Sequence, residues 1–140
     1  MTTHAEEDTM DEHPNVATVN RMTQAIFDQD RDALSRIFTD DMEFHLRGPI
    51  PNAGDHVGVD GLLGVLGALF ALTNGDIKLD QLFCVGTDGW AAEWERAVLG
   101  RAGKTLETYD AFIYRFEGDR IAEMWMFVGA TPERASSFLT

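Results

Sequence analysis

The residues from Trp90 to Val128 alternate in polarity through three consecutive segments, a pattern typical of β-strands joined by short turns. In the middle segment, residues 108–116, every second side chain lies on the same face of the strand. One face carries Asp110, Phe112, Tyr114 and Phe116. Burying a carboxyl group is costly unless it is paired, neutralised or used in chemistry. The sequence therefore predicts a small-molecule site at Asp110, on an otherwise aromatic sheet face.

Three helical patterns and two further strands precede these three strands. The predicted order is a helix from Asn15, a short helix capped by Asp30, a strand over 42–46, a loop over 48–58, a helix over 59–72 and strands over 77–85, 90–99, 106–116 and 120–128. Helices segregated from an antiparallel meander are typical of an α+β fold. We expect a curved antiparallel sheet wrapped around about three N-terminal helices, a cone-shaped α+β barrel with an inner pocket.

The length and charge of the chain limit its domain organisation and its partners. A chain of 140 residues with 44% hydrophobic side chains fits one folded domain. We predict a disordered acidic tail over 1–13, a single domain over 14–132 and a C-terminal tail over 133–140. Acidic residues outnumber Lys and Arg by 24 to 11, for a formal net charge of −13. Such a surface repels phosphate backbones and anionic lipid, so we expect neither a nucleic-acid nor a membrane partner.

Other sequence features bear on localisation and on metals. No apolar run reaches the roughly 20 residues that cross a bilayer, and residues 1–13 lack the apolar segment of a secretory signal. We therefore expect a cytoplasmic protein. A single cysteine, Cys84, excludes an internal disulfide and a cysteine cluster for zinc. No two histidines have metal-ligand spacing, so we expect no metal and no cofactor.

Three segments carry a family resemblance: residues 33–44 (ALSRIFTDDMEF), residues 58–62 (GVDGL) and residues 114–121 (YRFEGDRI). Together they resemble the nuclear transport factor 2-like superfamily, which includes SnoaL-like polyketide cyclases, ketosteroid isomerases and limonene epoxide hydrolases. The resemblance covers residues 15–130 and implies the cone-shaped fold and a homodimer formed through the sheet. It leaves function open, because this scaffold hosts enzymes, binding domains and dimerisation modules.

The better-known catalytic sets of that superfamily are not complete in this chain. The positions that match catalytic residues of the isomerases and the epoxide hydrolases hold Met22, Leu46, Phe112, Trp94, Arg96 and Met126. SnoaL-type cyclases use a histidine and an aspartate. The resemblance makes His45 and Asp110 the nearest candidates for these two roles.

The predicted pairing of two strands provides Asp110 with a partner. If the turn over residues 100–104 closes the hairpin, Trp94 lies opposite Asp110 and Arg96 lies diagonally, roughly 7–8 Å away. A cation at that range would hold Asp110 ionised, whereas burial alone would raise its pKa. Two interpretations follow. Asp110 and Arg96 form a structural ion pair, or Asp110 transfers protons while Arg96 or Tyr114 stabilises developing oxyanion charge.

The remaining candidates surround this centre. Residues predicted to contact a small apolar substrate are Trp90, Trp94, Phe112, Met22, Phe44, Leu46, Met124 and Met126. The same residues also fit an ordinary hydrophobic core. His45 should point out of the pocket unless a bulge reverses its strand, and His56 lies in a loop where a pocket mouth often sits. Glu93 and Glu95 are expected to face solvent or an interface, and Trp125 suggests a covered outer surface.

Three functional hypotheses follow from the sequence. The first is a cofactor-independent enzyme that performs proton transfer on an apolar substrate, by isomerisation, cyclisation, dehydration or epoxide opening. Asp110, Arg96 and Tyr114 would be its catalytic residues. The second is a non-catalytic protein that binds a small hydrophobic ligand. The third is a dimeric scaffold module whose pocket is filled by side chains.

Overall fold

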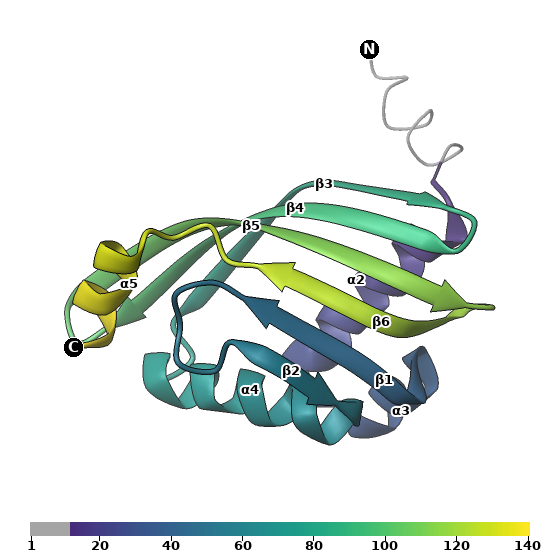
Figure 1. The fold of residues 1–140 in the computed structure, drawn as a ribbon, viewed down its shortest axis with the longest axis horizontal. Coiled ribbons are helices and arrows are strands. Elements are labelled where there is room, and N and C mark those ends of the chain that lie inside the picture. Colours follow the sequence, from purple (N-terminus) through teal and green to yellow (C-terminus); the bar gives the residue numbers. More distant parts are fainter. Residues whose placement is uncertain (1–11) are drawn as a thin grey trace, which may run out of the picture.

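The computed structural model describes residues 12–140, so the predicted acidic tail lies almost entirely outside the described residues. Helices and strands follow one another in the order α2 (Pro14–Phe27), α3 (Arg31–Ile37), β1 (Phe38–Arg47), β2 (Gly54–Val57), α4 (Gly58–Thr73), β3 (Ile77–Thr87), β4 (Trp90–Arg101), β5 (Lys104–Glu117), β6 (Arg120–Phe127) and α5 (Pro132–Leu139). Asp30 caps α3 as predicted, because its side chain accepts a hydrogen bond from the N–H of Ala33. The expected α+β architecture is confirmed (Figure 1).

The six strands form one curved, open sheet in the order β2-β1-β6-β5-β4-β3. Strand β1 is parallel to β6, and all other neighbouring strands are antiparallel. Helix α2 crosses one face of this sheet, and α4 runs beneath it (Figure 1). Figure 1 looks onto the other face, where α5 lies at one end and no further helix of residues 12–140 covers the strands. The inner face is therefore the side on which a site can be enclosed.

Two elements differ from the sequence prediction. Residues 54–57, predicted as part of a loop, form β2 and pair with β1 at the sheet edge. Residues predicted as a C-terminal tail form α5, whose N-cap Thr131 accepts a hydrogen bond from the N–H of Arg134. Ala135 and Phe138 of this helix are buried. Both elements are short, and their stability depends on packing against β1 or β5.

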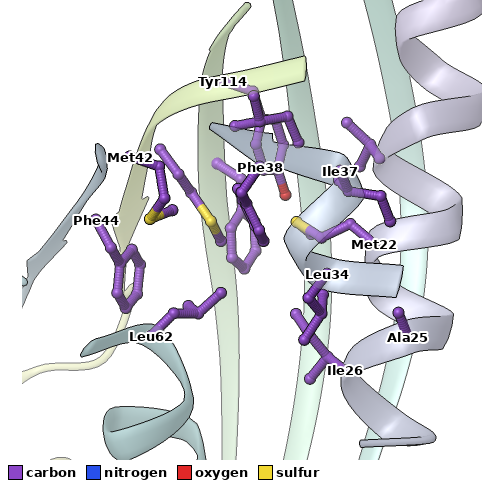
Figure 2. Close-up of a cluster of buried hydrophobic side chains, with 14 of the residues drawn as sticks. Met22, Ala25, Ile26, Leu34, Ile37, Phe38, Met42, Phe44, Leu62 and Tyr114 are labelled. Atoms are coloured by element: carbon purple, nitrogen blue, oxygen red, sulfur yellow. The ribbon is translucent and has the colours of Figure 1, made fainter. Parts of the chain in front are cut away.

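The core lies between the sheet and the helices. Figure 2 shows side chains from α2, α3, β1, α4 and β5 converging there. Its fully buried members include Val19, Leu34, Phe38, Met42, Phe44, Leu62 and Tyr114. Burial of each large apolar side chain contributes roughly 1.5–3 kcal/mol, so this cluster fixes how α2 and α3 sit against the sheet.

The most apolar segment of the chain is α4. It ends at Asn74, whose φ of 53° places it in the left-handed region and whose N–H bonds back to the carbonyl of Ala71. This end agrees with the sequence prediction for Asn74-Gly75. Within residues 12–140, neither α4 nor any other helix is long and apolar enough to span a membrane.

Candidate functional site

The β4–β5 hairpin determines which side chains reach the inner face. Its turn has only two residues, Ala102 and Gly103, with φ of 51° and 78°, and Arg101 pairs directly with Lys104. The prediction of a five-residue turn over 100–104 was wrong. A two-residue turn with both φ values positive suits strand twist but usually carries Asn-Gly, so Ala102 gave no sequence signal. The pairing is shifted by one residue, and a one-residue shift exchanges the two faces of a strand.

The shifted pairing brings three carboxyl groups together on the inner face. Glu95 lies opposite Asp110, and Glu93 lies opposite Phe112. The exposed fractions of Glu93, Glu95 and Asp110 are 4%, 5% and 3%. The prediction that Glu93 and Glu95 face solvent or an interface was therefore wrong. Only the two glutamates at alternating positions 93 and 95 could have indicated this face from sequence, and the aromatic Trp94 between them was the stronger apolar signal.

Arg96, Trp90 and Trp94 lie on the outer face instead. The Nε of Arg96 donates to Glu107 at 2.5 Å, so the predicted pairing of Arg96 with Asp110 was wrong. Trp94 stacks on Tyr109 with 6.0 Å between ring centroids, and Trp90 stacks on Trp125 at 6.2 Å. The prediction that both tryptophans line the pocket was also wrong. All three errors share one cause, the one-residue shift in the β4–β5 pairing, which exchanges the two faces of β4 relative to Asp110.

The inner face lines a cavity of about 160 Å³ between α2, α4, β1 and strands β3–β6. Six of the predicted pocket residues line it together with Asp110: Met22, Phe44, Phe112, Tyr114, Met124 and Met126. Leu46 is buried in the core but does not line the cavity. Residues that the sequence did not single out complete the wall, among them Ile26, Phe70, Ala97, Leu106 and Thr108.

Hydrogen bonds separate the three acids into two kinds. Glu93 accepts a bond from the Tyr114 hydroxyl at 2.8 Å and another from Nε2 of Gln81 at 2.7 Å. Asp110 accepts from the hydroxyl of Thr108 and from the N–H of Gly129, both at 3.1 Å. Each of these two acids therefore has a donor on both oxygens. Glu95 receives no hydrogen bond from any residue between positions 12 and 140.

The electrostatic surroundings differ in the same way. Burial, followed by the negative charges of Glu93 and Asp110, raises the pKa of Glu95 to about 8. Burial also raises the pKa of Asp110, while its bonds from Gly129 and Thr108 act in the opposite direction. The pKa of Tyr114 is raised, mainly by burial and by the neighbouring charge of Glu93. At neutral pH, Glu95 therefore carries a proton inside an apolar cavity.

This arrangement suits acid–base chemistry. Sites in which neighbouring titratable groups have different proton affinities can supply an acid and a base at one pH. Here Glu95 can donate a proton, whereas Asp110 is held as an acceptor by two donors. The hydroxyl of Tyr114 is engaged with Glu93, so in this structure it does not offer a free donor to an oxyanion.

The two candidate histidines lie outside the cavity. His45 points to the outer face, as expected for a neighbour of Phe44. Its Nδ1 lies 2.7 Å from Asp55 and its Nε2 lies 2.7 Å from Glu123. His56 belongs to β2, and its ring lies 6.1 Å from that of Phe44.

Among the described residues, one group of side chains has donor atoms close enough together to hold a metal ion. Donor atoms of Glu43, His45 and Glu123 lie within 4.8 Å of one another. Two of these residues already have protein partners, because Glu123 accepts a bond from Arg115 at 3.0 Å and both ring nitrogens of His45 contact carboxylates. The trio is separate from the three acids of the cavity.

The titration of His45 should report this network. Burial lowers the pKa of His45, but its hydrogen bonds to Asp55 and Glu123 outweigh burial and raise the pKa above the ordinary value of 6.5. A raised histidine pKa stabilises the fold below the unfolded value and loses that contribution as the pH rises through the folded value. We expect NMR titration to place His45 above 6.5 and Asp55→Asn to lower it. Asp80→Asn, on the opposite sheet edge, should leave it unchanged; equal effects would contradict the assignment.

Several solved structures share this fold. Among solved structures, Bal32a from a soil-derived mobile gene cassette superposes with a TM-score of 0.79 at 23% identity, covering 91% of this chain and 97% of that one. An NTF2-like protein from Burkholderia xenovorans LB400 gives 0.71 at 16% identity, covering 91% and 96%. IdmH of Streptomyces antibioticus, a proposed polyketide cyclase, gives 0.70 at 18% identity, covering 91% and 99%.

These neighbours establish the NTF2-like cone fold as the class of this protein. The sequence profile of the SnoaL-like domain matches residues 19–124, which is most of the chain. The chain therefore belongs to the SnoaL-like domain family, as the resemblance implied. No curated protein matches the sequence.

Proposed function

We propose that this protein is a small-molecule enzyme of the proton-transfer type that acts on an apolar substrate in the inner cavity. The observation that carries the proposal is Glu95, which is 5% exposed, receives no hydrogen bond from residues 12–140 and lines an apolar cavity beside two hydrogen-bonded acids. A carboxyl group on the wall of an apolar cavity, with a pKa raised to about 8, is typical of a group that takes part in acid–base chemistry.

The geometry suggests a role for each acid. Glu95 is the proton donor, because it retains its proton at neutral pH. Asp110 is the acceptor, because Thr108 and the N–H of Gly129 supply the donors that a carboxylate requires. Glu93 is held by Tyr114 and supplies negative charge beside Glu95. These roles replace the pairing of Asp110 with Arg96.

The class of reaction follows from the same features. An acid and a base on adjacent strands can move a proton from one atom of a substrate to another, which serves isomerisation, cyclisation or dehydration, and proton donation alone can open an epoxide. Structural similarity to IdmH, a proposed polyketide cyclase, supports a cyclisation among these possibilities. The apolar wall favours a substrate with few charged groups.

A deuterium-incorporation screen tests the proposal. The protein is incubated in D₂O with a panel of apolar enones, ketones and epoxides, and label incorporation and products are followed by NMR. Glu95→Gln and Asp110→Asn should each lower turnover by about 10²-fold or more, because general acid–base catalysis has that magnitude. Glu107→Gln, which removes a carboxylate from the outer face, should retain the wild-type rate. Turnover that survives both inner-face changes would contradict the proposal.

The second candidate function is a non-catalytic protein that binds a small hydrophobic ligand. One observation favours it: the positions that match catalytic residues of the isomerases and epoxide hydrolases hold other residue types in this chain. The variant Asp110→Asn separates the two functions. A binding protein should keep its ligand affinity in this variant, whereas the enzyme should keep affinity and lose turnover.

We also propose that the protein forms a homodimer through the outer face of the sheet. Exposed large side chains gather on β3–β6, where Phe83, Val85, Trp90, Tyr109 and Phe127 each have an exposed fraction of 41–55%. No helix of residues 12–140 covers the centre of this face (Figure 1). A contiguous apolar patch of this kind is typical of a protein interface.

The dimer can be tested at its centre. Ile113 lies opposite Ala92 and Trp125 in the sheet register, so Ile113→Lys places a charge in the middle of the face. We expect sedimentation velocity to show a shift from dimer to monomer, because a buried unpaired charge is strongly unfavourable. Ala68→Lys on the exposed side of α4 is the matched control and should remain dimeric. A wild-type monomer at micromolar concentration would contradict the proposal.

A further inference from the structure

The side chains that line the cavity have an unusual balance of charge. Three of them are the carboxyl groups of Glu93, Glu95 and Asp110, and no lysine, arginine or histidine is present among the lining residues of the described chain. The rest of the wall is apolar apart from the hydroxyls of Thr23, Thr108 and Tyr114. The cavity therefore combines negative charge with an apolar boundary, and residues 12–140 place no cationic side chain on its wall.

The hydroxyl donors of the cavity are already engaged. Thr108 donates to Asp110, Tyr114 donates to Glu93, and Thr23 donates to the carbonyl of Val19 at 3.2 Å. An anionic ligand would therefore meet three acids and would find no free donor among these hydroxyls. A ligand with an N–H donor would meet the unpartnered oxygens of Glu95, which is 5% exposed and lines the cavity.

We propose that the pocket selects an apolar molecule that carries one basic nitrogen, which binds at Glu95, and that it rejects carboxylates. This inference rests on the proposed function, because it names the substrate class of the same site. With a basic substrate bound, Glu95 is ionised, and the ammonium N–H that it holds takes the role of proton donor that the Glu95 carboxyl has toward a neutral substrate. An N–H bond to Glu95 satisfies the cavity acid that has no donor among the described residues, and a positive charge offsets the repulsion that Glu93 and Asp110 exert on Glu95. The apolar wall accommodates the rest of the molecule.

An organic cation fits these residues better than a metal ion. The metal-ligand geometry found among residues 12–140 lies at Glu43, His45 and Glu123 on the outer face, not at the cavity acids. An apolar wall also offers few oxygens to complete the shell of six or more ligands that hard cations such as Ca²⁺ and Mg²⁺ require. An ammonium group needs only hydrogen bonds to one or two carboxylates, while its carbon substituents contact the wall.

Binding of an amine should change the protonation state of Glu95. The ligand enters as an ammonium ion and the Glu95 carboxylic acid releases its proton to solvent, which leaves an N–H···O bond between ammonium and carboxylate. Because Glu95 is protonated at neutral pH, binding of an amine should release close to one proton at pH 7. Binding of a neutral alcohol should release none, since Glu95 keeps its proton.

Calorimetry with three matched probes tests the inference. The probes are 2-phenylethylamine, 2-phenylethanol and 3-phenylpropanoate, which share an aromatic body and differ in charge. We expect the amine to bind at least about tenfold more tightly than the alcohol, and the carboxylate not to bind detectably. Titration in buffers of different ionisation enthalpy then measures the released proton.

Matched variants assign the effect to Glu95. Glu95→Gln should remove the preference for the amine and its proton release while the alcohol still binds, and Glu95→Asp should keep a weaker preference. Glu107→Gln makes the same change in net charge on the outer face and should behave as wild type. Urea unfolding shows that each variant is folded before it is titrated.

Four results would overturn the inference: equal affinity for amine and alcohol, binding of the carboxylate, an amine preference that survives Glu95→Gln, or no binding of any probe. Its failure can be distinguished from failure of the proposed function. Deuterium incorporation into neutral substrates without an amine preference would retain the enzyme and reject this substrate class. An amine preference without turnover on any substrate, basic amines included, would retain the ligand class and reject the enzyme.

Discussion

At pH 9, the Glu95→Gln variant is expected to be more stable than the wild-type protein by on the order of 3 to 5 kcal/mol. The reason is the raised pKa of Glu95, about 8 in the folded protein against 4.5 for an ordinary glutamate. Between these two values the unfolded chain has lost the Glu95 proton and the folded protein retains it. The unfolded state then binds fewer protons, so the free energy of unfolding falls as the pH rises from about 4.5 to about 8.

Glutamine cannot ionise, so the variant lacks this loss of stability. At pH 5 the two proteins should differ by no more than about 1 kcal/mol, because a neutral carboxyl and an amide have similar shapes. Urea unfolding at pH 5, 7 and 9 measures the difference directly. The variant should keep a smaller pH dependence from Asp110, whose pKa is also raised by burial.

Glu107→Gln is the matched control for this prediction. It removes one carboxyl group from β5 on the outer face, where Glu107 is half-buried and bonds to Arg96. Its stability should follow the wild-type curve between pH 5 and pH 9. Parallel curves for the wild type and Glu95→Gln over that range would show that Glu95 is ionised in the folded protein, contrary to our assignment.

A second large effect is expected at Gly129, which follows β6. A Cβ atom at this position would overlap the backbone carbonyl oxygen of Tyr109. The backbone of Tyr109 cannot rotate away from this contact as a side chain could. Gly129→Ala should therefore destabilise the fold by about 2 to 3 kcal/mol. The same displacement would weaken the bond from the Gly129 N–H to Asp110, so loss of turnover should accompany loss of stability.

Gly100→Ala is the control for the clash at Gly129. A Cβ atom at Gly100 would also overlap a neighbour, but that neighbour is the carboxylate end of the exposed Asp76 side chain, which can move into solvent. Urea unfolding should therefore show a much smaller loss for Gly100→Ala. Equal losses at the two glycines, or an unchanged stability for Gly129→Ala, would contradict the steric argument.

Local sequence patterns predicted most of the elements that form this fold. Strands β3 to β6 lie where alternating polarity and turn residues placed them, and the helix around Leu62 ends at Asn74. Both signals depend on residues close together in the chain: side-chain alternation for strands and left-handed conformation for the helix end. Strand β2 has only four residues and depends on pairing with β1. Helix α5 does have a local start signal, an N-cap threonine followed by a proline, but it spans only eight residues and the sequence prediction missed it.

The candidate site was only partly predictable. The placement of Asp110 on the inner face beside Phe112 and Tyr114 followed from alternation within one strand. Its partners did not, because they depend on how β4 pairs with β5. The Ala102-Gly103 turn shifted that pairing by one residue, which placed Glu95 opposite Asp110 and moved Arg96 to the outer face.

The sequence by itself thus determined the α+β architecture, the family and an acid on an aromatic strand face, because these depend on periodicity and on local motifs. The tertiary structure alone decided that this acid belongs to a group of three. Strand pairing is a long-range property that turn geometry and the burial of one whole face determine. A shift of one residue in the pairing moves every side chain of a strand to the opposite face of the sheet. Because of this one-residue shift, the site is not the expected aspartate–arginine pair. It is a cavity with three acids and no cation among its described lining residues.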